Sequence, residues 1–379
     1  MKILLVGPSS PLRGGIANFN DSLYSALDKK HEVHIIGFSL QYPSLFFPGQ
    51  SQYEQGTSES GIRSEQIINS INPFSWFTTA GKIIKKKPGC LVVHYWMPFF
   101  APALGTIIRL VKKKLDVRVI GLMHNIKPHE SMPARRGLNN YFLNSCDGFI
   151  TLSSKVLDDL KDSGINKPVK LIPHPVYDIF GEPVSRQIAC DYLKLDPESN
   201  YMLFFGIIRH YKGLDLLLKS IASQKLSHLN LKLIVAGEFY ENEKRYLDMV
   251  KELGLDKQVL FTGSFIPKGD VRHYFAVSDL VVLPYLRATQ SGITPVAYHF
   301  NKPVLVTNVG GLKEVVPHGR TGYVCEKDPD EIAAAITDFF DNNRSPEFIE
   351  NIKTEKKKFS WDAMVRGIED LAAEISGFI

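Results

Sequence analysis

Short runs of β-branched and other apolar residues alternate with amphipathic segments along the whole chain. In the first half, the apolar runs predict strands at residues 2–6, 32–38, 91–95, 117–122, 148–152 and 169–173. Between them, apolar positions recur with the period of a helix and predict helices at 16–27, 104–114 and 153–163, the last with Ser153 as its N-cap. This alternation is typical of a parallel sheet with helices on both faces.

The same alternation fills the second half of the chain. It predicts strands at 201–206, 231–237, 259–263, 280–284 and 303–308 and helices at 214–223, 244–253, 294–299 and 330–342. Asp328 or Asp330 is the expected cap of the helix at 330–342. Two final helices, at 346–359 and 361–376, have no strand after them. The second half is therefore predicted to be another doubly wound α/β unit.

A break in this alternation marks the predicted domain boundary. Residues 178–200 are polar and contain Pro183 and Pro197, a composition that suits a linker. A chain of 379 residues is long enough for about two domains. We therefore expect an N-terminal domain at 1–180 and a C-terminal domain at 181–359.

Composition favours a cytoplasmic protein without a structural metal. No run of about 18 apolar residues predicts a transmembrane helix. The first residues suit a strand that leads into a glycine loop better than a signal peptide. The four cysteines are scattered singly, without the spacing of a zinc site.

Positive charge is concentrated in the first half. Residues 1–180 carry 21 Lys and Arg against 13 Asp and Glu, a net charge of +8, whereas the remainder carries 24 against 27, a net charge of −3. The lysine runs within 82–87 and 112–114 suit either solvated helix ends or a surface that meets anionic lipid or an anionic acceptor. No nucleic-acid-binding module accompanies them, so nucleic acid is not an expected partner.

Two aromatic segments bear on the same question of lipid contact. The long segment 38–61 is either a loop pinned by its own aromatic residues or a wall that faces the acceptor or a membrane. With the aromatic segment 99–102 and the lysine runs, it raises the expectation of peripheral contact with the inner face of the membrane.

Ligands in doubly wound sheets bind at the carboxyl ends of strands, which directs attention to the residues that follow each strand. After the first strand, Gly14 and Gly15 precede a helix in a segment that matches neither GxGxxG nor GxxxxGK[ST]. Backbone N–H groups there can approach an anion closely, although a plain turn explains the pair equally well.

Polar side chains gather after the strand at 117–122. His124, Asn125, His129 and Glu130 lie within seven residues, an unusual density for core residues. We expect them to contact or orient a substrate. The spacing is not that of HExxH on a helix, so it does not predict zinc.

The most informative segment follows the strand at 201–206. Gly206 ends that strand, and Arg209 and Lys212 lie three residues apart just before Gly213 and a helix. The glycine lets a phosphate approach the backbone, and two cations can neutralise a diphosphate leaving group. Further residues expected around the same ligand follow the later strands: Gly237, Glu238, Ile266, Thr289, Gln290, Ser291, Gly292, Ile293 and Glu314.

Taken together, these segments resemble the retaining, family-4-type glycosyltransferases (glycosyl transferases group 1) with the GT-B fold. The resemblance is carried by Gly14-Gly15, by His124, by Gly206-x-x-Arg209-x-x-Lys212-Gly213, and by segments 279–285 and 302–314. It implies two Rossmann-like domains facing a central cleft, with residues 360–379 forming a helix that crosses back to the N-terminal domain.

The resemblance also implies where the substrates bind. The C-terminal domain would hold a UDP- or GDP-linked sugar as co-substrate, with Arg209 and Lys212 on its diphosphate, and the N-terminal domain would bind the acceptor. Such enzymes need neither a metal nor another cofactor. Asp328 and Asp330 have the spacing of a metal-binding DxD pair, but helix capping explains them better.

One departure from the family pattern concerns the donor loop. Two glutamates separated by seven residues are usual there, and their places fall on Ala288 and Val296. We expect Thr289, Gln290 and Ser291 to take over part of their work.

The leading hypothesis is a retaining transferase that acts on a carbohydrate or lipid-linked acceptor in cell-surface polysaccharide or glycolipid biosynthesis. His124 would contact the sugar, and Asn125, His129 and Glu130 would lie on the acceptor side. Two alternatives stay open: a non-catalytic sugar-nucleotide-binding subunit, and a nucleotide-sugar epimerase on the same fold.

Overall fold

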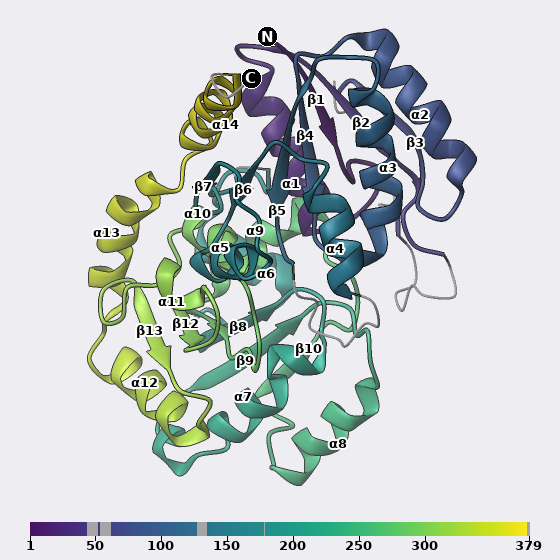
Figure 1. Ribbon diagram of the computed structural model, residues 1–379. Coiled ribbons are helices and arrows are strands. Elements are labelled where there is room, and N and C mark those ends of the chain that lie inside the picture. The colour runs from purple at the N-terminus through teal and green to yellow at the C-terminus, as the bar shows by residue number, and fades with distance from the viewer. Residues whose placement is uncertain (44–51, 54–61, 127–134, 178, 377–379) are drawn as a thin grey trace. The chain divides into compact units, whose positions relative to one another are not determined.

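The computed structural model describes residues 1–43, 52–53, 62–126, 135–177 and 179–376. The chain divides into two compact units, which are coloured by residue number in Figure 1. Met1–Pro175 and Ser360–Ile379 form the N-terminal unit, and Val176–Phe359 form the C-terminal unit.

The N-terminal unit is built on a seven-stranded parallel sheet with the strand order β3-β2-β1-β4-β5-β6-β7. Its strands are β1 (Lys2–Val6), β2 (Glu32–Leu40), β3 (Ser64–Asn69), β4 (Cys90–Tyr95), β5 (Arg118–Met123), β6 (Gly148–Thr151) and β7 (Val169–Leu171). The central strands β1 and β4 are almost wholly apolar and buried, as expected of strands covered on both faces.

Helices cover this sheet, and the last of them comes from the far end of the chain. They are α1 (Gly15–Leu27), α2 (Pro73–Lys86), α3 (Ala101–Lys112), α4 (Arg135–Leu143), α5 (Ser154–Lys161) and α14 (Trp361–Ser376), with a short 3-10 turn at Pro98–Phe100. Helix α14 packs on α1 and against β5, β6 and β7. Its Leu371 and Ile375 lie over Gly148, where a Cβ atom would approach the Ile375 side chain to 3.0 Å.

The C-terminal unit holds a six-stranded parallel sheet with the order β10-β9-β8-β11-β12-β13. Its strands are β8 (Asn200–Phe205), β9 (Leu231–Ala236), β10 (Val259–Phe261), β11 (Leu280–Leu283), β12 (Val304–Thr307) and β13 (Gly322–Cys325). Its helices are α6 (Arg186–Leu193), α7 (Leu214–Ile221), α8 (Glu243–Glu252), α9 (Lys268–Val277), α10 (Ile293–His299), α11 (Leu312–Val315), α12 (Pro329–Asp341) and α13 (Ser345–Glu355). Both sheets are those of doubly wound α/β proteins, so the predicted fold class is confirmed.

Two predicted helix caps are confirmed at atomic detail. The Ser153 hydroxyl accepts a hydrogen bond from the Val156 N–H at the start of α5. The Asp328 carboxylate accepts from the N–H groups of Asp330 and Glu331 at the start of α12. Asp328 is therefore explained by capping.

The sequence pattern missed several elements and misplaced one helix end. Strands β3 and β13 and helices α2, α4, α6, α9 and α11 were not predicted, and most of them are short. The helix predicted at 294–299 is confirmed as α10. The helix expected at 346–359 ends at Glu355 and continues only as a 3-10 turn over Lys356–Lys358. This end is followed by Phe359, which packs against Tyr298.

Candidate functional site

The turn after β8 packs tightly against the end of the neighbouring strand β9. Gly206 has a φ of +94°, and its N–H donates to the Ala236 carbonyl over 2.9 Å. A Cβ atom on Gly237 would lie 2.1 Å from the Gly206 carbonyl oxygen. Only glycine fits at position 237, so the end of β9 stays tight against the backbone of this turn.

The same turn buries a lysine. Residues His210–Lys212 form a 3-10 turn that Gly213 ends in the left-handed region, at φ +71°. Glycine is the only residue type that fits at position 213, because a Cβ atom there would lie 1.9 Å from the Pro284 carbonyl oxygen. The Lys212 side chain is only 8% exposed. Its Nζ lies 5.7 Å from the centroid of the Tyr285 ring, and a Cβ atom on Gly206 would approach that Nζ to 3.2 Å.

The electrostatics of Lys212 are those of a cation without a counter-ion. Burial, followed by the positive charge of Arg209, lowers the pKa of Lys212 to about 7. Within the described part of the chain, no carboxylate or carbonyl accepts a hydrogen bond from its ammonium group. A buried charge in this state is destabilising unless a partner of opposite sign arrives.

Arg209 adds a second cation to the same turn. Its half-buried guanidinium lies 5.3 Å from the centroid of the Tyr240 ring. The described residues provide it with no carboxylate partner either. Among the described residues, no ion pair offsets the charge of Arg209 or of Lys212. An anionic ligand would offset both charges.

The loop after β11 is held in place by its own side chains. The Ser291 hydroxyl lies 3.3 Å from the Tyr285 hydroxyl and accepts from the Ile293 N–H over 3.1 Å. The Thr289 carbonyl accepts from the Gly311 N–H over 3.1 Å. At the end of the loop, the Ile293 side chain comes so near to Gly206 that a Cβ atom there would lie 3.4 Å from it. The structure thus brings the predicted Gly206, Lys212 and Ile293 together.

The remaining donor-side residues lie at the same edge of the C-terminal sheet, because its strands are parallel. Glu238 is buried after β9 and its carbonyl accepts from the Ile208 N–H. Ile266 is buried after β10, Gln290 and Gly292 belong to the loop after β11, and Glu314 is exposed on α11 after β12. These positions agree with a ligand at the carboxyl edge of this sheet, while their individual roles stay predictions.

The two positions that depart from the family pattern differ in the structure. Val296 is buried on α10, and Ala288 contributes a carbonyl that packs against Gly310. Near them lies Thr294, which the sequence analysis did not select. Its hydroxyl is buried and has no hydrogen-bond partner in the described chain. The sequence could have indicated Thr294, because it is a hydroxyl residue in the first turn of the helix that follows Gly292.

The N-terminal unit places His124 in a cluster of buried histidines. His124 follows β5, and its N–H donates to the Tyr95 carbonyl over 2.8 Å. The His94 Nδ1 and the His124 Nε2 are joined by a hydrogen bond of 2.9 Å. The Phe19 ring packs edge-on against His94, His124 and His174, at centroid distances of 5.8, 5.1 and 4.9 Å.

Burial keeps these three rings neutral. It lowers the pKa of His94 to about 3 and that of His174 to about 4. The pKa of His124 lies well below its ordinary value because of burial, with smaller contributions from His94 and His174. A neutral His124 can donate or accept a hydrogen bond but carries no charge near pH 7. His94 and His174 were missed, since one lies inside a predicted strand and the other follows one.

The glycine pair, expected on the donor side, and the described acceptor-side residue Asn125 belong to the same unit as this cluster. Gly14 precedes α1 with a φ of +129°, and Gly14 and Gly15 both have open space where a Cβ atom would lie. Asn125 follows His124, and its buried Oδ1 has no partner among the described residues. His129 and Glu130 lie outside the described residues.

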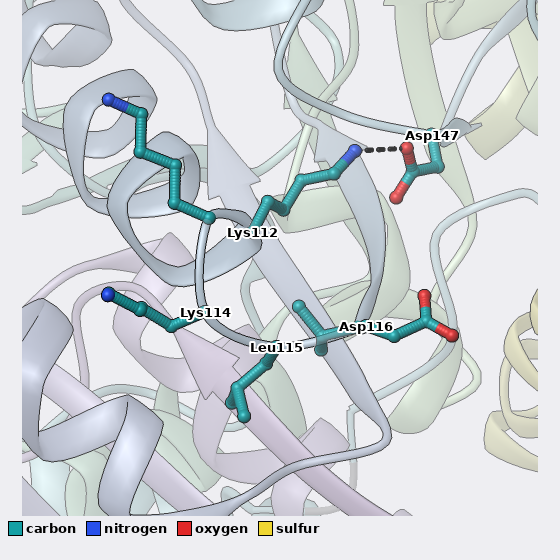
Figure 2. A pocket seen from close by; sticks show the side chains of 7 residues that line it. Lys112, Lys114, Leu115, Asp116 and Asp147 are labelled. Carbon is teal, nitrogen blue, oxygen red and sulfur yellow. Dashed lines mark hydrogen bonds and ion pairs between the residues drawn. The ribbon is translucent and has the colours of Figure 1, made fainter.

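A hollow elsewhere on the N-terminal unit is separate from these residues. It is lined by Lys112–Val117 and Asp147 and is shown in Figure 2. Asp116 and Asp147 precede β5 and β6, so the hollow lies at the amino edge of the sheet, opposite the edge at which His124 lies. Lys112 forms an ion pair with Asp147 across it.

The described residues offer neither a metal-binding cluster nor a membrane-spanning helix. They contain no group of three or more His, Cys, Asp or Glu side chains that could hold a metal ion. No helix in the described part of the chain has the length and hydropathy of a membrane-spanning segment.

Comparison with known proteins gives a consistent result. The family described as Glycosyl transferases group 1 matches residues 189–359, and Glycosyltransferase Family 4 matches residues 13–178. An uncharacterized glycosyltransferase from Methanocaldococcus jannaschii is 25% identical over 99% of both chains. The lipopolysaccharide 1,2-N-acetylglucosaminetransferase of Salmonella typhimurium is 22% identical over 92% of this chain and 85% of its own.

A solved structure shares the fold over the full length. HepE of Anabaena, solved in complex with UDP-glucose, superposes with a TM-score of 0.74 over 100% of both chains at 17% sequence identity. With the two family matches covering both units, the chain belongs to the group 1 glycosyltransferases and has their GT-B fold.

Proposed function

We propose that this glycosyltransferase is a retaining enzyme that moves a sugar from a UDP- or GDP-linked donor to a glycan or lipid-linked acceptor in the synthesis of cell-surface polysaccharide or glycolipid. The observation that carries the proposal is the buried ammonium of Lys212, which has Arg209 beside it and no counter-ion in the described chain. A nucleoside diphosphate supplies the missing negative charge.

The chemistry follows from where charge develops. As the bond between the sugar carbon and the diphosphate oxygen breaks, negative charge grows on the leaving group, and Lys212 and Arg209 would stabilise it. Gly206 leaves the backbone free for close approach of a phosphate. A phosphate oxygen of the donor would accept the proton of the acceptor hydroxyl on the face from which the diphosphate departs, so the configuration at the sugar carbon is retained.

The neutral His124 suits a hydrogen bond to a sugar hydroxyl. The ring stays neutral near pH 7, because burial lowers the pKa of His124 well below its ordinary value. The hydrogen bond between the His94 Nδ1 and the His124 Nε2 fixes the orientation of the His124 ring. We assign His94 a positioning role.

Relatives support the choice of substrates. The Anabaena protein binds UDP-glucose, and the Salmonella protein acts on lipopolysaccharide, as their names state. The first supports a nucleotide-sugar donor and the second a lipid-linked acceptor.

A donor screen tests the proposal directly. Release of UDP or GDP from a panel of nucleotide sugars is measured with and without candidate acceptor glycolipids. We expect one donor to release its nucleotide faster when an acceptor is present, with the anomeric configuration of the donor kept in the product as read by NMR. Interconversion of two nucleotide sugars without nucleotide release would show an epimerase instead, and an inverted product would exclude retention.

Removing either cation should slow turnover. Loss of a charge-assisted hydrogen bond of ~1.5–3 kcal/mol that strengthens in the transition state predicts that Arg209→Ala and Lys212→Met each lower the rate at saturating donor at least roughly tenfold. Lys212→Met should leave the thermal midpoint unchanged or raised, because it removes an unpaired buried charge.

Lys302 offers a matched control for Lys212. It is also buried, with its pKa lowered to about 8, but its Nζ donates to the carbonyls of Ala276 and Ser278. Lys302→Met should therefore lower the thermal midpoint and leave turnover nearly unchanged. Wild-type rates for Arg209→Ala and Lys212→Met would place the diphosphate elsewhere.

His124→Ala should lose turnover while nucleoside diphosphate binding persists, because His124 belongs to the N-terminal unit and the proposed diphosphate residues to the other. Steady-state rates and calorimetric titration with UDP and GDP separate the two effects. His174→Ala is the control, since it removes a neighbouring ring that packs on the same Phe19. Equal rates for the wild type and His124→Ala would make His124 a packing residue only.

A further inference from the structure

Helix α2 exposes aromatic side chains that no part of the described chain covers. Phe74 is 81% exposed and Phe77 58% exposed, and Ile71, just before the helix, is 54% exposed. The opposite face of α2 packs on the unit through Thr79, Ala80 and Ile83. Exposed large apolar residues grouped in this way mark an interaction surface.

The helix is well anchored, so these exposures do not come from a frayed end. The Asn72 side chain caps α2 by accepting from the Phe74 N–H. The Trp76 Nε1–H donates to the Asn69 carbonyl over 2.8 Å. Phe74 and Phe77 are therefore held outward on a fixed helix.

Lysines continue the same face toward the end of the helix. At 100° per residue, Phe74, Phe77, Gly81 and Lys85 fall on one stripe. Lys82 and Lys86 both pair with Glu65, over 3.1 and 2.8 Å. Lys85 and Lys87 are exposed and have no carboxylate partner among the described residues.

We propose that this α2 face, defined as Ile71, Phe74, Phe77, Lys82 and Lys85, binds the surface of an anionic lipid bilayer. Aromatic side chains enter the boundary between headgroups and acyl chains, and lysines contact lipid phosphates. The charge complementarity selects a lipid surface over a second copy of this chain, whose α2 face would present the same positive charge.

The geometry also fixes how the helix lies. Phe74 and Lys85 are separated by about 16 Å along the axis at a rise of 1.5 Å per residue. That exceeds the Debye length of about 8 Å at physiological salt. Lysines and aromatic residues can act together only if α2 lies flat along the bilayer.

This surface differs from the segments that the sequence suggested. In segment 99–102, Phe100 is buried and Phe99 packs against the core. In the run 112–114, Lys112 is paired with Asp147. The segment at 38–61 lies largely outside the described residues. The α2 face combines the two features that binding needs, exposed aromatic residues and lysines. Its aromatic end follows β3 at the carboxyl edge of the sheet, where His124 also lies.

Vesicle flotation tests the inference without donor or acceptor, so its outcome is independent of the proposed transfer reaction. The wild type should float with phosphatidylcholine vesicles that contain phosphatidylglycerol and should be released by salt. Phe74→Ser/Phe77→Ser should lower the partition coefficient at least tenfold. Lys82→Gln/Lys85→Gln should lower it on anionic vesicles at least tenfold, from roughly fivefold per lysine.

Two control pairs keep the test specific. Ile188→Ser/Tyr192→Ser changes residues on α6 that are 55% and 53% exposed, and Lys113→Gln/Lys114→Gln changes the other lysine run. Both should bind as the wild type does. The inference fails if the wild type does not bind the vesicles or if the α2 variants bind as the wild type does. It also fails if the control variants lose as much vesicle binding as the α2 variants. It also fails if light scattering shows that the phenylalanine pair instead holds two copies together.

Discussion

An ammonium group buried without a counter-ion is the constraint on which the C-terminal unit depends. Removing a charge from water costs several kcal/mol unless a partner offsets it, and Lys212 has none in the described chain. The fold accommodates the Lys212 side chain through close contacts. Gly213 allows the chain to turn beneath Pro284, Gly206 leaves room for the Nζ, and the Tyr285 ring offers a weak cation–π contact. Without an anion this environment disfavours the charged form of Lys212, and an arriving anion favours it.

The pKa of Lys212 expresses the same constraint. An unfolded lysine titrates near pH 10.4 and Lys212 in the folded protein titrates at about 7. Between these values the unfolded chain binds the proton and the folded protein does not, so this group makes the stability of the empty protein rise with pH across that window. A bound diphosphate favours the charged form, which raises the pKa again and draws a proton in. Substrate binding and protonation are thereby linked at one side chain.

The sequence revealed local patterns better than assembled ones. Gly206, Arg209, Lys212 and Gly213 lie within eight residues after a single strand, so their common purpose could be predicted. The histidine cluster could not, because His94, His124 and His174 come from three separate segments that only the parallel order of β4, β5, β6 and β7 gathers around Phe19. The lack of a counter-ion for Lys212 among the described residues was equally hidden, since it depends on the positions of all the carboxylates in the fold. Strand β3 and helix α2 were missed, and with them the aromatic face at Phe74 and Phe77.

The most direct test of the account is the proton balance of diphosphate binding. UDP and GDP are titrated calorimetrically at about pH 8, where their phosphates are fully ionised, in buffers of different ionisation enthalpy. We expect the wild type to take up close to one proton per bound nucleotide, because Lys212 is mostly neutral before binding and charged after it. Lys212→Met should bind more weakly and take up none. Binding by wild type without proton uptake, or equal uptake by Lys212→Met, would contradict the claim that the buried lysine holds the diphosphate.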